Sequence, residues 1–231
     1  NNFSIRNNWV IDTGLYGIFP EFGHNGLIEN NILSEIEDAA IYVGMSDYID
    51  GRNNQVFDNV AGIEVENSRH VLVEGNVARN NTGGILVFIT PGLPIKSSYD
   101  AVIRRNFVTS NNTPNFAIPG SLVAGIPSGT GVLVMSGDRV VIEDNIITGN
   151  NTGGIIVTSG DFVTEVASDR DSDPHSDNVE IRNNVMFDNG NDPDGEMKLL
   201  MLSKFSTKGP DILAYQSAAD KARGSCISRR E

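Results

Sequence analysis

Short apolar segments with a period of two recur along the chain at regular intervals. Each recurrence reads as an apolar pair, a charged residue, a variable residue, an asparagine and another apolar stretch. A period of two is typical of strands and not of helices. The asparagines that mark the repeat are Asn8, Asn31, Asn54, Asn76, Asn106, Asn145 and Asn184, with spacings of 23, 23, 22, 30, 39 and 39 residues.

A second strand-like phrase follows six of the seven marker asparagines. It consists of a small residue, an aliphatic residue, a variable residue and another aliphatic residue, as in GIEV from Gly62 and GILV from Gly84. One such unit cannot bury its own apolar face, whereas stacked units can. The sequence therefore predicts an all-β right-handed parallel β-helix, a solenoid of about seven coils of roughly 22 residues each over residues 1–194.

The position two residues before each marker asparagine alternates in charge. It is occupied by Arg6, Glu29, Arg52, Glu74, Arg104, Glu143 and Arg182. Opposite charges on neighbouring strands are stabilising and like charges are destabilising. We therefore expect these residues to form a structural ladder that fixes the register of the coils.

The longer spacings predict loops inserted into the stack at residues 90–97, 112–127 and 160–175. Loops on a rigid scaffold often carry the specific function. After Asn189 the repeat stops, and GEMKLLMLSKF from Gly195 has helical spacing. Residues 195–231 are predicted to form a cap and tail with a short helix that folds over the last coil or lies along one side of the solenoid.

One outward-facing stripe of the second strand is apolar, which is unusual for a surface exposed to water. The stripe comprises Leu86, Phe88, Leu133, Met135 and Ile156. Two explanations are open: apolar residues of the inserted loops cover it, or it is a surface that binds a protein partner or a ligand. The loop residues that could cover it are Leu93, Ile95, Phe116, Ile118, Leu122, Val123 and Ile126.

Composition narrows the classes of partner. The chain has 30 acidic and 17 basic residues and a net charge of −13, which disfavours nucleic acid and anionic lipid. Cys226 is the one cysteine, so no internal disulfide can form. No apolar run reaches the roughly 18 residues of a transmembrane segment. Because the chain begins inside a repeat, we expect that upstream coils belong to the protein.

Several phrases resemble an uncharacterised bacterial family of secreted or lipoprotein-type right-handed parallel β-helix proteins, related to carbohydrate-binding and sugar-hydrolase β-helix proteins. The matching phrases are LYGIFP from Leu15, DAAIYVGMSDYI from Asp38, NVAGIEVENS from Asn59, NTGGILVFITPGLP from Asn81 and NNTPNFAIPGSLVAGIPSGTGVLVM from Asn111. The resemblance implies export to the periplasm, the outer membrane surface or the exterior. It carries no catalytic residues over to this chain.

Polar and aromatic residues gather at equal offsets from the marker asparagines of the early coils, and His24 shares the column of Asp47 and Arg69. Sugar lyases and epimerases need a base, an acid and a group that neutralises a carboxylate. The candidate catalytic residues are Tyr42, Glu64, Glu66 and His70. The candidate substrate-binding residues are Phe19, Tyr42, Asp47, Tyr48, Arg69 and His70.

The third insertion and the residues after it, DRDSDPHSDNVE, offer two further signals. Five acidic residues echo the spacing of a calcium-binding loop, and calcium is the cofactor that they would suit. They are Asp169, Asp171, Asp173, Asp177 and Glu180. The string Asp173-Pro174-His175 also resembles part of the DPH motif of alginate C5-epimerases.

Three functional hypotheses follow. The leading one is an exported β-helix protein that binds a polysaccharide or another component of the cell envelope. An alternative is a polysaccharide lyase, C5-epimerase or hydrolase. A third is a structural subunit that docks a protein partner through the apolar stripe. The fold alone cannot choose among them, because different functions are grafted on one fold.

Overall fold

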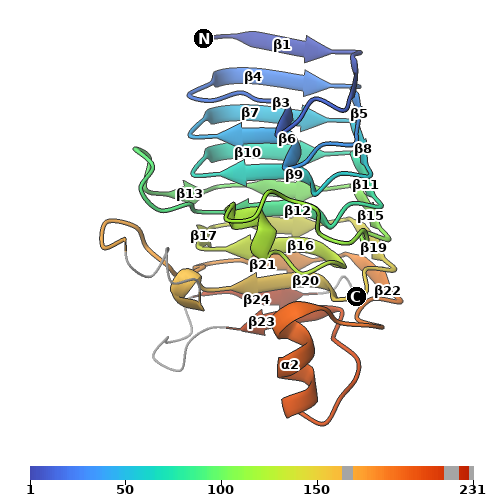
Figure 1. The fold of residues 1–231 in the computed structure, drawn as a ribbon. Coiled ribbons are helices and arrows are strands. Elements are labelled where there is room, and N and C mark those ends of the chain that lie inside the picture. The colour runs from blue at the N-terminus through green and yellow to red at the C-terminus, as the bar shows by residue number, and fades with distance from the viewer. Residues whose placement is uncertain (163–168, 216–223, 229–231) are drawn as a thin grey trace.

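The chain forms three parallel sheets that run the length of a β-helix (Figure 1). The structure, a computed structural model, describes residues 1–162, 169–215 and 224–228. Sheet A contains β1 (Phe3–Arg6), β4 (His24–Glu29), β7 (Asp47–Arg52), β10 (Arg69–Glu74), β13 (Ser98–Tyr99), β14 (Val102–Arg104), β17 (Gly137–Asp138), β18 (Val141–Glu143), β21 (Glu180–Arg182) and β24 (Cys226–Ser228).

The other two sheets complete each coil. Sheet B contains β2 (Trp9–Ile11), β5 (Ile32–Ser34), β8 (Gln55–Phe57), β11 (Val77–Arg79), β15 (Phe107–Thr109), β19 (Ile146–Thr148) and β22 (Val185–Phe187). Sheet C contains β3 (Tyr16–Ile18), β6 (Ala39–Gly44), β9 (Ala61–Glu66), β12 (Gly83–Phe88), β16 (Thr130–Met135), β20 (Gly153–Thr158) and β23 (Ile212–Tyr215). The predicted parallel β-helix is confirmed.

The marker asparagines form a buried ladder at the corner between sheets A and B. Asn54 is representative: its backbone N–H and its Nδ2 both donate to Oδ1 of Asn76, at 2.8 and 3.0 Å, and its Nδ2 also donates to the carbonyl of Ile28. From Asn31 to Asn145 each side-chain amide thus bonds the coils on both sides, and these buried asparagines satisfy the polar groups of the turns.

The residue before each marker asparagine adopts a left-handed backbone conformation. Asn and Asp tolerate this conformation and Gly adopts it freely, whereas most residues avoid it. The sequence supplies suitable residues at six of the seven positions, Arg105 being the exception. The seven residues are Asn7, Asn30, Asn53, Gly75, Arg105, Asp144 and Asn183.

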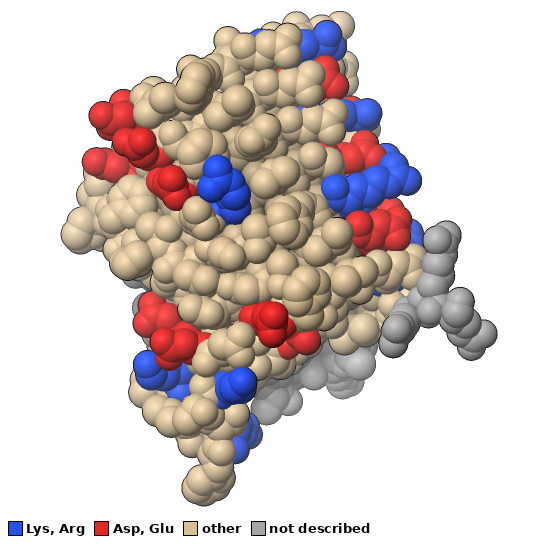
Figure 2. All heavy atoms as spheres, turned by 90° about the vertical axis from the view of Figure 1, so that its right-hand side faces the viewer, with Lys and Arg blue, Asp and Glu red and all other residues tan. Residues whose placement is uncertain are grey.

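The charge ladder occupies the predicted register on sheet A, with Arg6, Glu29, Arg52 and Glu74 directly paired in succession and the alternation continuing to Arg182. Figure 2 shows the alternating basic and acidic side chains along one edge of the face that it presents. Glu74 is the best-connected member. It lies 3.7 Å from Arg52, 2.9 Å from Arg104 and 3.0 Å from Arg105, and these cations lower its pKa.

Reversing the charge of Glu74 should therefore destabilise the fold. In Glu74→Arg, opposite-charge pairs become like-charge pairs, and we expect a loss of about 1–2 kcal/mol in the free energy of unfolding. The second substitution Arg104→Glu should recover part of this loss. Urea unfolding at low and high salt measures both effects, with Glu35→Arg, an exposed position outside the ladder, as the control. An equal loss in the control would contradict the ladder interpretation.

The solenoid continues beyond the predicted boundary at residue 194. Helix α2 (Gly195–Ser203) is present as expected and takes the second of the two expected positions, along one side of the solenoid beside sheet C, where Met197 and Met201 pack with Ile156. The chain then returns to the stack: β23 pairs with β20, and β24 pairs with β21. These strands were missed because no marker asparagine precedes them.

The chain itself covers part of the apolar stripe. Leu86, Phe88 and Met135 are buried in one cluster with Val123 and Ile126 of the second insertion, which contains the 3-10 helix η1 (Leu122–Gly125). Leu122 packs at its edge. The expected cover is wrong for Phe116 and Ile118, which are exposed, and Leu93 and Ile95 of the first insertion do not join the cluster.

No helix in the described ranges is long and apolar enough to cross a membrane.

Candidate functional site

The predicted site residues lie in two groups on either side of the corner between sheets C and A. Tyr42, Glu64 and Glu66 lie on the outer face of sheet C, whereas Asp47 and Arg69 begin strands of sheet A. Arg69 follows Glu66 by three positions in the chain, so their Cα atoms lie within about 11 Å. The two groups are neighbours, but each has its own network of contacts.

The group on sheet A is a row of four rings, one on each of four successive coils. His24 contacts Tyr48 edge-on at 5.4 Å, Tyr48 stacks on His70 at 4.5 Å with 4° between the planes, and His70 meets Tyr99 edge-on at 5.5 Å. The guanidinium of Arg139 lies over the ring of Tyr99 at 4.7 Å. Tyr48 is 50% exposed, so the row faces solvent.

Ion pairs hold this row in place. Asp47 forms an ion pair with Arg69 at 2.8 Å and lies 2.7 Å from Nδ1 of His70. Asp100 lies 3.3 Å from Nε2 of the same imidazole and 2.7 Å from Nε of Arg139. Both nitrogens of His70 therefore face carboxylates. We name His24, Asp47, Tyr48, Arg69, His70, Tyr99, Asp100 and Arg139 the ring row.

The backbone explains why these side chains align. Tyr48, His70, Asp100 and Arg139 all adopt left-handed conformations, with φ of 57°, 54°, 58° and 49°. Such conformations are strained for bulky residues and are maintained only where the surrounding structure imposes them. Because each residue occupies the same place in its coil, the side chains project in one column along the solenoid.

Tyr99, Asp100 and Arg139 were missed by the sequence reasoning, although a signal was present. Tyr99 precedes its marker asparagine by seven residues, as do His24, Asp47 and Arg69. Asp100 and Arg139 share the offset of six with Tyr48 and His70. Extending these offsets past the first insertion would have found all three.

The group on sheet C is a cluster of buried carboxyl groups beneath three aromatic rings. Phe19 stacks on Tyr42 at 4.6 Å, and Tyr16 lies 4.5 Å from Phe19 and 4.8 Å from Tyr42. The buried carboxyl groups are those of Asp38, Glu64 and Glu66. We name these six residues the acidic-aromatic cluster; Tyr16 and Asp38 were missed because no repeat offset links them to the others.

Burial raises the pKa of every carboxyl group in this cluster. Burial and then the neighbouring Glu66 raise the pKa of Asp38 to about 6, although a hydrogen bond from Tyr16 opposes the shift. Burial and the charge of Asp38 raise the pKa of Glu64, which is 1% exposed and whose Oε1 has no hydrogen-bond partner among the described residues. Burial also raises the pKa of Glu66, to which Tyr42 donates a hydrogen bond.

These arrangements separate the predicted catalytic set. His70 belongs to the ring row, where its nitrogens already face Asp47 and Asp100. Tyr42 and Glu64 are buried in the acidic-aromatic cluster. Among the predicted substrate-binding residues, Asp47, Tyr48, Arg69 and His70 lie together, while Phe19 and Tyr42 lie on the other side of the corner.

The acidic residues of the third insertion do not converge. Asp169 accepts hydrogen bonds from Lys96 at 2.7 Å and from the backbone of Gly92 at 3.0 Å. These bonds connect the third insertion to the first, and they lower the pKa of Asp169. Asp173 bonds the backbone of His175, and Glu180 pairs with Arg182. The described residues contain no group of three or more His, Cys, Asp or Glu side chains that could hold a metal ion. The predicted calcium ligands therefore do not form such a group; they are Asp169, Asp171, Asp173, Asp177 and Glu180.

The Asp173-Pro174-His175 string is held by hydrogen bonds to residues that follow the strands β16 and β20 of sheet C. The carbonyl of Pro174 accepts hydrogen bonds from the backbone of Gly160 and from the hydroxyl groups of Ser136 and Ser159. Nδ1 of His175 lies 3.8 Å from a carboxylate oxygen of Asp161. Asp161 belongs to the 3-10 helix η2 (Gly160–Phe162), which begins the third insertion.

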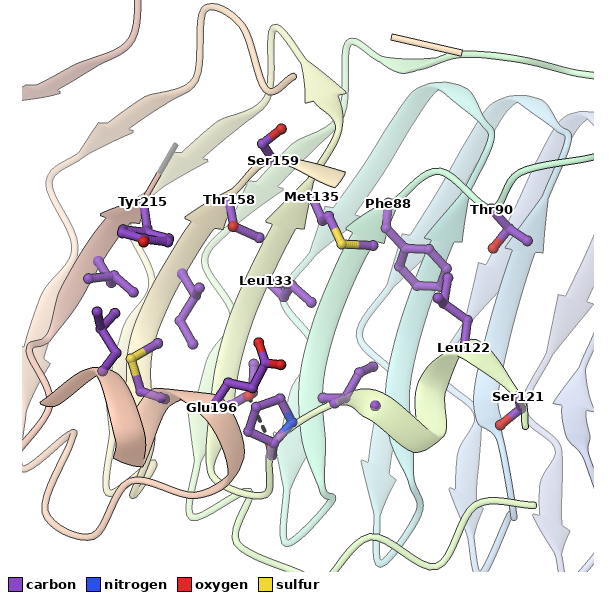
Figure 3. Close-up of a pocket in the computed structure, with 18 of the residues that line it drawn as sticks. Phe88, Thr90, Ser121, Leu122, Leu133, Met135, Thr158, Ser159, Glu196 and Tyr215 are labelled. Carbon is purple, nitrogen blue, oxygen red and sulfur yellow. Dashed lines mark hydrogen bonds between the residues drawn. The ribbon is translucent and has the colours of Figure 1, made fainter. Parts of the chain in front are cut away.

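A pocket of about 720 Å³ lies on the outer face of sheet C, beside the acidic-aromatic cluster. Figure 3 shows it bounded by η1 and α2, with Phe88, Leu133 and Met135 rising from the strands beneath. Its size falls within the range of small-molecule sites. Phe88 pairs with Glu66 in the register, so the pocket and the cluster adjoin.

The fold and the family model define the class of protein. Residues 1–170 match the model described as the right handed beta helix region, and the chain belongs to that family. The comparison with curated protein sequences gives no match.

Solved structures of three polysaccharide-acting proteins share the fold. The A-module of the mannuronan C-5 epimerase AlgE6 from Azotobacter vinelandii superposes with a TM-score of 0.70 at 15% identity, over 100% of this chain and 58% of that one. The AlgE4 A-module from the same organism gives 0.66 at 17% identity, over 98% and 58%. An alginate lyase from Paenibacillus sp. str. FPU-7 gives 0.56 at 16% identity, over 93% and 75%. The chain thus spans little more than half the length of the two epimerase modules.

Proposed function

We propose that the protein binds an extended polysaccharide along the ring row. The observation that carries this proposal is the alignment of four rings on four successive coils, flanked by two guanidinium groups, on a surface that faces solvent. A row that repeats once per coil suits a ligand that itself repeats. Aromatic side chains combine an apolar surface with polar tips, a combination that suits sugars.

The charges of the row indicate what kind of polysaccharide fits. Arg69 and His70 pair with Asp47, and Arg139 pairs with Asp100, so the row carries little unbalanced charge. The chain as a whole has a net charge of −13, which opposes a polyanion. Recognition would therefore rest on sugar hydroxyl groups, and neutral or sparsely charged polymers are the expected ligands.

Removing a ring from the middle of the row should weaken binding. We expect Tyr48→Asn and His70→Asn each to reduce affinity for the bound polymer by about tenfold, the equivalent of 1.4 kcal/mol. Asparagine is the appropriate replacement because it tolerates the left-handed backbone at both positions. A glycan array followed by isothermal titration with the best neutral and acidic hits measures the effect.

Glu35→Asn is the matched control, because Glu35 is also left-handed and exposed but lies outside the row. Unchanged affinity in both row variants, with normal melting temperatures, would refute this site. Selective binding of a highly charged uronate polymer would refute the proposed preference for neutral ligands.

The second candidate is catalysis on a polysaccharide by the acidic-aromatic cluster. The observation that favours it is the set of raised carboxyl pKa values beside a pocket, a combination that is common in active sites. Two of the three structural neighbours are modules of mannuronan C-5 epimerases, and the third is an alginate lyase. Binding ranks first because Glu64 and Tyr42 are buried and His70 is held by two carboxylates.

Product analysis separates the two candidates. Incubation with uronate and neutral polysaccharides, followed by NMR and by absorbance of unsaturated ends, should show no new product if the protein only binds. A product that disappears in Glu66→Gln would establish catalysis instead. We also propose that the protein acts in the periplasm, at the outer membrane surface or outside the cell, as the sequence phrases imply.

A further inference from the structure

The pocket on sheet C differs chemically from the ring row. Its floor consists of outward-facing side chains of four adjacent strands: Phe88 of β12, Leu133 and Met135 of β16, Ile156 of β20 and Leu213 of β23. Four strands at about 4.8 Å spacing give a floor roughly 14 Å long. Met197 and Leu200 of α2 form one wall, and Leu122 and Ile126 form another. A floor of this kind suits hydrocarbon and not hydroxyl-rich sugar.

Polar groups occupy the rim of the pocket. In Figure 3, Thr90, Thr158 and Ser159 lie along the edge where the strands end, while Ser121 lies beside η1. The hydroxyl oxygen of Ser121 is buried and has no hydrogen-bond partner among the described residues. A buried hydroxyl group without a partner is costly, and a ligand with a polar end would satisfy it.

An apolar floor and a polar rim suit an amphiphilic ligand, and the charge around the pocket indicates which charge that ligand would carry. Glu196 is the one charged residue among the described residues that line the pocket. Its carboxylate would repel an anionic ligand, in keeping with the net charge of −13.

We propose that this pocket binds a small neutral or cationic amphiphile, with its apolar body across the floor of sheet C and its polar end at the rim. The site is separate from the ring row, so the proposal does not depend on polysaccharide binding. The volume of about 720 Å³, the apolar floor, the hydroxyl-bearing rim and the acidic surroundings all specify this class of ligand.

Two fluorescent probes of almost identical shape test the proposal. N-phenyl-1-naphthylamine is neutral, and 1-anilinonaphthalene-8-sulfonate adds an anionic group. We expect the neutral probe to bind saturably with 1:1 stoichiometry and the anionic probe to bind at least tenfold more weakly. Glu196→Gln should narrow that difference. Equal affinities of the two probes for the unaltered protein would overturn the proposed charge preference.

Filling the pocket tests its location. Thr158 faces the pocket from β20, and Thr158→Trp should weaken binding of the neutral probe at least tenfold. Thr148→Trp is the matched control, because Thr148 lies on a strand of sheet B, far from the pocket lining. Ser121→Trp fills the pocket from the η1 side and serves if the first variant does not fold.

Loss of binding in a folded pocket variant but not in Thr148→Trp supports the site. Unchanged probe binding in a folded Thr158→Trp or Ser121→Trp variant overturns it. Near-ultraviolet circular dichroism establishes that each variant retains native packing, so that probe binding to a loosened protein is not mistaken for binding to the pocket. Glycan titration of the same variants should be unaffected, which keeps a failure of this proposal distinct from a failure of the polysaccharide proposal.

Discussion

Replacement of Asn76 by alanine is expected to destabilise the protein by about 3–4 kcal/mol, one of the two largest effects that we predict. Its Oδ1 accepts from the backbone N–H and from Nδ2 of Asn54, at 2.8 and 3.0 Å. Its Nδ2 donates to the carbonyl of Gly51 at 2.9 Å and to Oδ1 of Asn106 at 3.0 Å. Alanine would leave all four partner groups without their bond, in a corner from which water is excluded.

The free energy of unfolding in urea measures this effect, and Asn8→Ala provides the control. Asn8 occupies the same position in the first coil, but it is exposed and bonds a coil on one side only. We expect its replacement to cost about 1 kcal/mol, because water can reach the groups left behind. Equal losses at the two positions would show that the ladder contributes nothing beyond local turn chemistry.

Features that repeat once per coil were readable from the sequence, and the marker asparagines and charge ladder are the clearest cases. A second buried ladder went unnoticed, although it lies exactly five residues after the first in the last five marked coils. Its members bond one another as the first ladder does. They are Asn59, Asn81, Asn111, Asn150 and Asn189.

At the end of the solenoid, the coil structure continues although the sequence repeat does not. Nδ2 of Asn189 donates to a carboxylate oxygen of Asp211 at 2.7 Å, so an aspartate takes the place of the next asparagine. The register then continues through β23 without the repeated phrase. Because the backbone of a stacked coil needs only a compatible partner, its sequence can diverge until no pattern remains.

The candidate site was less predictable than the fold. Offsets correctly grouped Asp47, Tyr48, Arg69 and His70, because these residues occupy equivalent places in their coils. The pocket depends on how η1 and α2 fold back onto sheet C, and no periodicity encodes that packing. Asp38 likewise joins the acidic-aromatic cluster because of the conformation of the turn directly before β6, which no repeat in the sequence predicts.

The buried carboxyl groups should make the protein less stable as the pH rises from about 4.5 to 8, and this is the second large effect. A carboxyl group whose pKa is raised by folding favours the folded state while it is protonated. That stability is complete below the unfolded-state pKa and is lost as the pH rises through the folded-state pKa. For Asp38 this window runs from 3.8 to about 6, which corresponds to about 1–3 kcal/mol after allowance for partial exposure. Glu64, fully buried and with a raised pKa, acts in the same direction.

Substitutions that remove these ionisations should flatten the dependence on pH. We expect Asp38→Asn and Glu64→Gln each to raise the free energy of unfolding at pH 8 and to change it little at pH 4.5, because the wild-type groups are largely protonated in the folded protein at acidic pH. Glu37→Gln, an exposed carboxyl group on the same coil as Asp38, controls for the overall reduction in negative charge. Chemical unfolding across this pH range measures the slopes. If all three variants show the slope of the wild type, folding does not raise the pKa values of these carboxyl groups, and the predicted pH dependence is wrong.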